Sequence, residues 1–155
     1  MKGKIRLIDD PGNSTYDLSL LIAPLHEAEG STFSSQHRLT LGKHDHCDID
    51  LSAGRTASDE DTAKALKRVS RQHAVLQPAR GYIKYTDISS NGTTVVRQGR
   101  VYHLEKNSTF YLHDGDKLYL GIQDISKRKI AYGPLHFVDR QKSLRTVLRS
   151  LFGLQ

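Results

Sequence analysis

The sequence has little of what several large classes of protein require. Its 155 residues include a single cysteine, Cys47, which excludes an internal disulfide and is compatible with a reducing compartment. No run approaches the ~20 apolar residues of a membrane helix. The basic start at residues 1–4 leads into no apolar signal core. We therefore expect a cytoplasmic, globular chain long enough for one domain.

Recognisable catalytic signatures are also missing from the sequence. There is no Gly-x-Ser-x-Gly elbow, no phosphate-binding P-loop and no kinase signature, and the one thiol has no familiar Cys/His setting. We therefore expect a protein that is not an enzyme and that needs no cofactor.

The net charge of +6 is unevenly distributed along the chain. Residues 1–121 hold 16 basic and 15 acidic side chains, whereas residues 122–155 hold seven basic and two acidic ones. The excess positive charge therefore belongs to the C-terminal segment. It leaves open an adaptor role for that segment on nucleic acid or on an anionic membrane.

Short segments with strand character recur at spacings of about 8–12 residues, and turn residues separate them. This pattern predicts an all-β, antiparallel sandwich or barrel. The predicted strands cover residues 4–8, 18–22, 38–41, 74–76, 82–86, 93–96, 101–104, 108–112, 117–121 and 135–138.

Two segments interrupt this rhythm. Residues 52–67 form a polar insertion in which Ser58 could cap a short helix, with Asp59, Glu60 and Asp61 in its first turn. Residues 139–155 carry apolar side chains at the spacing of one helical face, which predicts a basic amphipathic helix with Asp139 as its N-cap. That helix could pack on the sandwich, or it could mediate dimerisation or bind a polyanion.

Four fragments in a fixed order carry a family resemblance. They are Leu-Gly-Lys at 41–43, Val-Ser-Arg-Gln-His-Ala at 69–74, Asp-Ile-Ser-Ser-Asn-Gly-Thr at 87–93, and the run 112–121 that contains Gly-Asp. Together they resemble the forkhead-associated (FHA) domain, a phosphothreonine-binding module. The resemblance extends from about residue 16 to 138 and implies an FHA-like antiparallel β-sandwich of about eleven strands. We expect this domain to cover residues 1–138, with its motifs in 41–121. The resemblance does not cover 139–155.

The resemblance also implies which residues bind the ligand. A phosphothreonine carries about −1.5 to −2 charges and three acceptor oxygens, so it needs converging hydroxyl, amide and cationic donors. Ser70 offers its hydroxyl and its backbone N–H, and the neighbouring Arg71 offers a forked cation. Ser90 would add a second hydroxyl, and Asn91 would hydrogen-bond the ligand main chain. Arg68 could also reach this pocket.

Other motif residues are expected to hold the loops rather than the ligand. His73 would fix the binding loop through hydrogen bonds, and Gly42 would permit a close backbone approach or a positive φ. Asp87 and Thr93 are expected to support the loops. Gly92 would supply the positive φ of a tight turn.

Lys43 departs from the family pattern, in which arginine is usual. Lysine keeps the positive charge but loses the planar fork. We expect binding to survive with help from Arg68 and Arg71. The alternative is a degenerate FHA scaffold that docks a protein without phosphate.

Two further features have competing interpretations. The run His44-Asp45-His46-Cys47-Asp48 could ligate zinc, but it lacks a second ligand pair. We therefore expect no metal, and a surface loop with Cys47 turned inward. The insertion at 52–67 could place its acidic residues in the cationic pocket, although a solvated loop with a capped helical turn is the simpler interpretation.

The sequence therefore predicts a phosphothreonine-dependent protein-binding module of a signalling pathway. The partner would be a Thr-phosphorylated protein or peptide, which implies an upstream Ser/Thr kinase.

Overall fold

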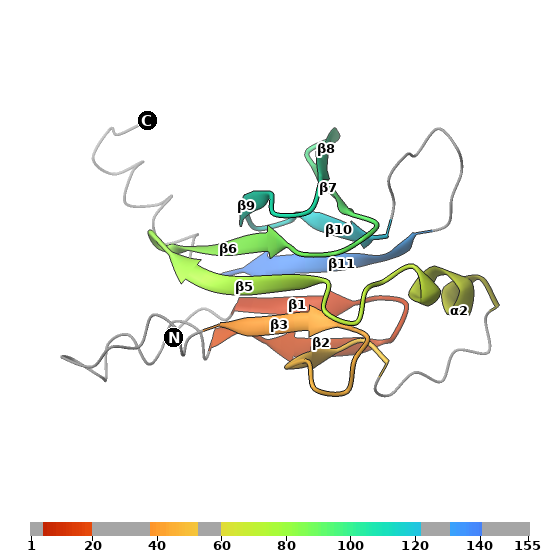
Figure 1. Cartoon of the computed structure of the whole chain (residues 1–155). Helices are drawn as coiled ribbons and strands as arrows, with labels where there is room; N and C mark the ends of the chain where they lie inside the picture. The colour runs from red at the N-terminus through yellow and green to blue at the C-terminus, as the bar shows by residue number, and fades with distance from the viewer. Residues whose placement is uncertain (1–4, 20–37, 53–59, 122–130, 141–155) are drawn as a thin grey trace, which may run out of the picture.

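The computed structural model describes residues 5–19, 38–52, 60–121 and 131–140. Within them, eleven strands form two sheets packed face to face, and one helix lies at one end of the sandwich (Figure 1). No helix among these residues is long and apolar enough to cross a membrane. The architecture confirms the FHA-like β-sandwich that the strand pattern and the motifs predicted.

The first sheet has six strands, in the order β2-β1-β11-β10-β7-β8. These strands are β2 (Ser14–Asp17), β1 (Ile5–Asp9), β11 (Tyr132–Asp139), β10 (Lys117–Leu120), β7 (Thr93–Arg97) and β8 (Arg100–Leu104). The second sheet has five strands, in the order β4-β3-β5-β6-β9. They are β4 (Ile49–Asp50), β3 (Leu39–Gly42), β5 (Ala74–Ala79), β6 (Tyr82–Asp87) and β9 (Thr109–Leu112).

The core lies between the two sheets and follows from the alternation of side chains along each strand. In β6, Ile83, Tyr85 and Asp87 point inward while the residues between them are only half buried. In β1, Ile5 and Leu7 do the same. Burial of these apolar faces is the main favourable term for a sandwich of this size.

Two tight hairpins fix which strand ends lie together. The β5–β6 turn contains Arg80 and Gly81, and the β7–β8 turn contains Gln98 and Gly99, all with positive φ. Such two-residue turns match the twist of paired strands and set their register. The β6–β7 and β8–β9 loops lie together, because Thr93 pairs with Leu104 and the backbone of Asp87 is hydrogen-bonded to that of Asn107 and Ser108.

The structure corrects the predicted strand list in three places. Ser14–Asp17 and Ile49–Asp50 are strands that we did not predict. β4 pairs with β3 in parallel, so the sandwich is not wholly antiparallel. Leu18 is buried but lies outside any strand, and residues 20–22 of that prediction lie outside the described residues.

The helix predicted in the insertion is present as α2 (Glu60–Lys67). Ala65 and Leu66 anchor it in the core, and Glu60 and Asp61 occupy its first turn. The predicted cap, Ser58, lies outside the described residues. So does most of the predicted C-terminal helix, because the described chain stops at Arg140 and Asp139 belongs to β11. The structure therefore gives that helix no support.

Candidate functional site

Four loops meet at the end of the sandwich where α2 lies (Figure 1). The β3–β4 loop covers residues 43–48, and the chain leaving α2 covers 68–73 before β5 begins. The β6–β7 loop covers 88–92 and the β8–β9 loop covers 105–108. All six residues that we predicted to bind the ligand lie on the first three of these loops.

Ser70 joins two of the loops through its hydroxyl group. Its Oγ accepts a hydrogen bond of 3.0 Å from the backbone N–H of Ser90. The hydroxyl hydrogen can therefore still be donated outward. Its own backbone N–H donates to Nδ1 of His73 at 3.1 Å. This corrects our prediction that the N–H of Ser70 is offered to a phosphate, because His73 already takes it.

Arg71 is exposed while its backbone is held in place. Its carbonyl accepts hydrogen bonds from the N–H of His44 at 3.2 Å and from Sγ of Cys47 at 3.0 Å. Gly42 makes this approach possible, since a Cβ there would collide with the Arg71 carbonyl. The close approach therefore explains the glycine, and the guanidinium is left at the surface.

Lys43 binds the end of α2 in this structure. Its Nζ donates to the carbonyl of Lys67 at 3.0 Å. A cation at a helix C-terminus satisfies an orphan carbonyl and interacts favourably with the helix dipole. The lysine that replaces the family's arginine thus ties the β3–β4 loop to the helix.

His73 is wholly buried and connects the Ser70 loop to the β6–β7 loop. Because Nδ1 accepts from Ser70, the ring hydrogen resides on Nε2, which donates to the carbonyl of Gly92 at 3.0 Å. Burial disfavours the imidazolium and lowers the pKa of His73 to about 4, although nearby Asp87 acts in the opposite direction. The ring is therefore neutral near pH 7.

Asp87 organises the β6–β7 loop from inside the core. Its Oδ1 accepts from the N–H and the hydroxyl of Ser89, at 2.9 and 2.8 Å. Its Oδ2 accepts from the hydroxyl of Thr93 at 2.6 Å. Ser89 Oγ in turn accepts from the N–H of Gly92, which has φ of 81°. This network holds the turn from below, and burial raises the pKa of Tyr85, whose hydroxyl also bonds Thr93.

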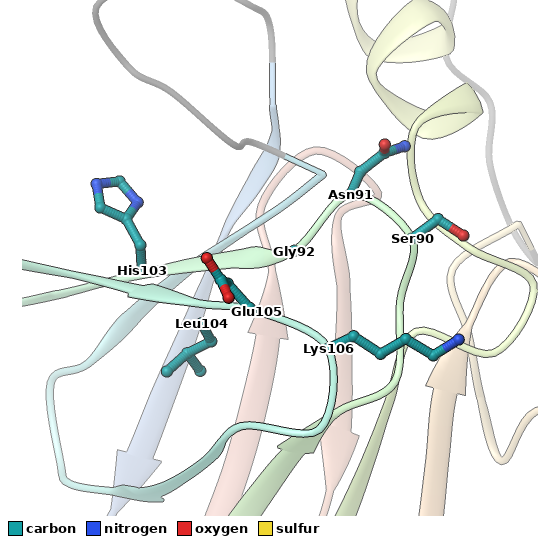
Figure 2. Close-up of a pocket in the computed structure, with 7 residues that line it drawn as sticks. All are labelled: Ser90, Asn91, Gly92, His103, Leu104, Glu105 and Lys106. Carbon is teal, nitrogen blue, oxygen red and sulfur yellow. The ribbon is translucent and has the colours of Figure 1, made fainter.

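Ser90 and Asn91 form the outer part of the same loop. Ser90 is exposed, and in Figure 2 its hydroxyl and the Asn91 amide point away from the loop in different directions. Asn91 Nδ2 donates to the carbonyl of Arg68 at 3.0 Å. The amide therefore braces the chain that leads from α2 to Ser70, while Arg68 itself is half buried.

Three residues that we did not predict lie beside Asn91. His103, Glu105 and Lys106 line a hollow of about 410 Å³ together with Ser90, Asn91, Gly92 and Leu104 (Figure 2). Thr93 pairs with Leu104 across β7 and β8, which brings the two loops together. The Gln-Gly hairpin turn could have indicated this, because it returns residues 105–106 to the same end as Asn91.

Three residues of the His44–Asp48 run form a cluster of potential metal ligands. The ligand atoms of His44, Asp45 and His46 lie within 4.8 Å of one another. Nδ1 of His44, however, accepts the N–H of His46, which occupies that lone pair. Cys47 is buried, and burial raises the pKa of its thiol, so it behaves as the inward residue that we predicted.

The acidic start of α2 lies away from Ser70. Asp61 lines a smaller hollow of about 160 Å³ with Pro11 and Tyr132, beside the start of β11. The position of Asp61 therefore does not support the idea that the acidic residues of the insertion occupy the cationic pocket. The other two acidic residues considered for that role are Asp59 and Glu60, and Asp59 lies outside the described residues.

The family can now be assigned from sequence as well as from geometry. The family model of the FHA domain matches residues 39–121, which include every motif loop described above. The chain belongs to the FHA domain family. Among curated proteins, no sequence match reaches significance.

Solved FHA domains have the same fold. The N-terminal FHA domain of Saccharomyces cerevisiae Rad53, in complex with a phosphothreonine peptide, superposes with a TM-score of 0.58 at 24% identity. That match covers 92% of this chain and 98% of the Rad53 domain. The FHA domain of human APLF, in complex with an XRCC1 bisphospho peptide, gives 0.50 at 22% identity, covering 88% and 98%.

Proposed function

We propose that this FHA domain binds phosphothreonine in a partner protein, without catalysing a reaction. The observation that carries the proposal is the Ser70 loop. The Ser70 hydroxyl accepts from Ser90 N–H and can still donate its own hydrogen, and Arg71, the next residue in the chain, is exposed. Family membership and the phosphothreonine peptide bound by the Rad53 domain support the same function.

In the proposed complex, two kinds of hydrogen-bond donor bind the phosphate oxygens. The hydroxyl of Ser70 donates a short charge-assisted hydrogen bond to one oxygen, and the guanidinium of Arg71 donates to one or two others. Ser90 contributes from the facing loop. Lys43 adds positive charge at a distance, because its ammonium group is bonded to α2.

The proposed partner is a protein phosphorylated by a Ser/Thr kinase. Binding alone requires no cofactor and no turnover, and the described site offers recognition groups rather than an activated nucleophile. The cytoplasmic location stays a prediction, since it depends on the sequence composition only.

The proposal is tested by replacing single donors. We expect Ser70→Ala and Arg71→Ala each to weaken binding of a phosphothreonine peptide pool by more than about tenfold, because each removes a hydrogen bond to a charged group. Gln72→Ala is the matched control, because Gln72 is exposed between Arg71 and His73. Calorimetric or fluorescence titration measures the affinities.

The same titration includes the unphosphorylated pool. Equal affinity of the wild-type domain for both pools would refute the proposal and would favour the degenerate scaffold that docks without phosphate. Unchanged affinity in Ser70→Ala would reject the site.

A further inference from the structure

The hollow beside the Ser70 loop carries opposite charges on its two sides. In Figure 2, Lys106 extends toward the side on which the Ser90 hydroxyl lies, whereas Glu105 points the other way, toward His103. Both residues follow β8 directly and belong to the β8–β9 loop. Leu104, the last residue of β8, is buried next to them.

The walls of the hollow are rigid. The N–H of Gly92 is bonded to Ser89, and its carbonyl accepts from His73 and from the N–H of Gly121. His103 is held as well, because its Nδ1 lies 3.2 Å from the hydroxyl of Thr94. A site with fixed walls loses little entropy when a ligand side chain enters it.

The Glu105 carboxylate is the acidic group of this hollow. It is exposed, and among the described residues it makes no hydrogen bond or ion pair. Because Glu105 is exposed, water partly screens its charge, so we expect a modest attraction for a cation that enters the hollow. The volume of about 410 Å³ accommodates a long side chain.

The hollow adjoins the proposed phosphate site. Ser90 lines it, and the Ser90 N–H bonds the hydroxyl of Ser70 at 3.0 Å. A peptide whose phosphothreonine lies at Ser70 therefore passes within one or two residues of the hollow. The phosphate meets the side of Ser90 and Lys106, and a neighbouring residue meets the side of Glu105.

We propose that this hollow is a second subsite, which takes a lysine or arginine side chain next to the phosphothreonine, with Glu105 as the residue that selects it. This inference rests on the proposed function. It makes the preferred ligand a phosphothreonine segment with a basic flanking residue. An acidic flanking residue is disfavoured at Glu105.

The experiment is a selection from a phosphothreonine peptide library with random flanks, followed by titration of the selected peptides. We expect the wild-type domain to enrich lysine or arginine at one flanking position and to bind that peptide about two- to fivefold more tightly than its alanine version. In Glu105→Gln this gain is lost, and in Glu105→Lys aspartate or glutamate is selected at that position instead.

Asp45→Asn is the matched control, because Asp45 is an exposed acid of the β3–β4 loop at the same end of the molecule and does not line the hollow. We expect it to keep the preference for a basic residue. Loss of that preference in Asp45→Asn as well would show a diffuse charge effect and would overturn the subsite.

The two proposals fail in different ways in this experiment. Three results would overturn the subsite alone while binding still depends on phosphate. The wild-type domain could enrich no basic residue, it could enrich an acidic residue, or the basic preference could persist in Glu105→Gln. Binding that does not depend on phosphate overturns the proposed function and the subsite with it.

Discussion

Two buried carboxylates, one near each end of the sandwich, are stabilised in different ways. Asp116 accepts hydrogen bonds from Nε and Nη2 of Arg97, at 2.8 and 2.7 Å, and from the N–H of His113 at 2.8 Å. The hydrogen bonds from Arg97 to the Asp116 carboxylate raise the pKa of Arg97. Among the described residues, the Asp87 carboxylate at the site instead accepts hydrogen bonds from the neutral donors of Ser89 and Thr93 alone.

The difference determines where positive charge remains for a ligand. At the Asp116 end the guanidinium is bound by the protein's own acid and stacks on Phe110, 4.6 Å from the ring centroid. At the Asp87 end hydroxyls and amides satisfy the carboxylate. Among the described residues no acid pairs with Arg71, so its charge can serve a bound phosphate.

The largest expected effect comes from removing each carboxylate in turn. Asp116→Ala removes the carboxylate partner of Arg97, and we expect it to lower the free energy of unfolding by about 2–4 kcal/mol. It should not change phosphopeptide affinity. Asp87→Ala leaves the neutral donors of Ser89 and Thr93 without their acceptor. We therefore expect a smaller loss of unfolding free energy, about 1–3 kcal/mol, together with weaker phosphopeptide binding. Urea unfolding and peptide titration separate the two effects; a binding defect in Asp116→Ala would contradict this comparison.

The pH dependence of stability provides the second test. The folded pKa of His73 is about 4, below the ordinary value of 6.5, so the unfolded chain takes up the proton first. This residue therefore stabilises the fold fully above about pH 6.5, and its contribution falls by up to ~1.4 kcal/mol per pH unit down to pH 4. Urea unfolding from pH 7.5 to 4.5 measures the slope.

The control for this slope is His73→Gln, which cannot titrate. It should be less stable than the wild type at pH 7.5, and its stability should depend less on pH between 6.5 and 4. Parallel pH profiles for the two proteins would show that His73 does not control the acid sensitivity of the loop.

Glycines at the two ends should respond differently to alanine. In Gly42→Ala the new Cβ meets the Arg71 carbonyl, so the loop must move. We expect a loss of about 1–3 kcal/mol and impaired phosphopeptide binding. Gly99 has φ of 78° and open space around it, so Gly99→Ala should cost about 1 kcal/mol and leave binding intact. Thermal unfolding and titration check both; normal binding by Gly42→Ala would be evidence against a tightly positioned Arg71.

The smallest effect is expected at Lys43. Because its Nζ is bonded to Lys67, Lys43→Ala should lose a helix C-terminal interaction of about 0.3–1 kcal/mol. Phosphopeptide affinity should fall less than about threefold, with Lys117→Ala as the exposed lysine control. A loss as large as that in Arg71→Ala would identify Lys43 as a direct phosphate ligand.

The sequence predicted most of the sandwich because its strands alternate clearly. It missed Ser14–Asp17, whose side chains are half buried or exposed, and Ile49–Asp50, which is too short to show a period. The predicted strand at 74–76 is also too short, since β5 continues to Ala79 and β6 pairs with it along its whole length.

The motif loops were predictable, but their contacts were not. Short fragments in a fixed order indicated Ser70, Arg71 and Asn91. The same fragments do not show that the N–H of Ser70 is bound to His73 or that Lys43 binds α2, because both depend on tertiary geometry. Glu105 belongs to no motif, and only the pairing of β7 with β8 brings it to Gly92.

The end of α2, together with Arg68 directly after it, acts as an anchor for two of the loops around it. Two consecutive carbonyls, of Lys67 and Arg68, receive Lys43 from one loop and Asn91 from another, and Ser70 follows two residues later. The spacing between this anchor and Ser70 is therefore set by chain after the helix. A one-residue insertion between Arg68 and Ser70 would change that spacing while leaving α2 and both of these hydrogen bonds in place, so the length of this short connection controls where the Ser70 hydroxyl lies.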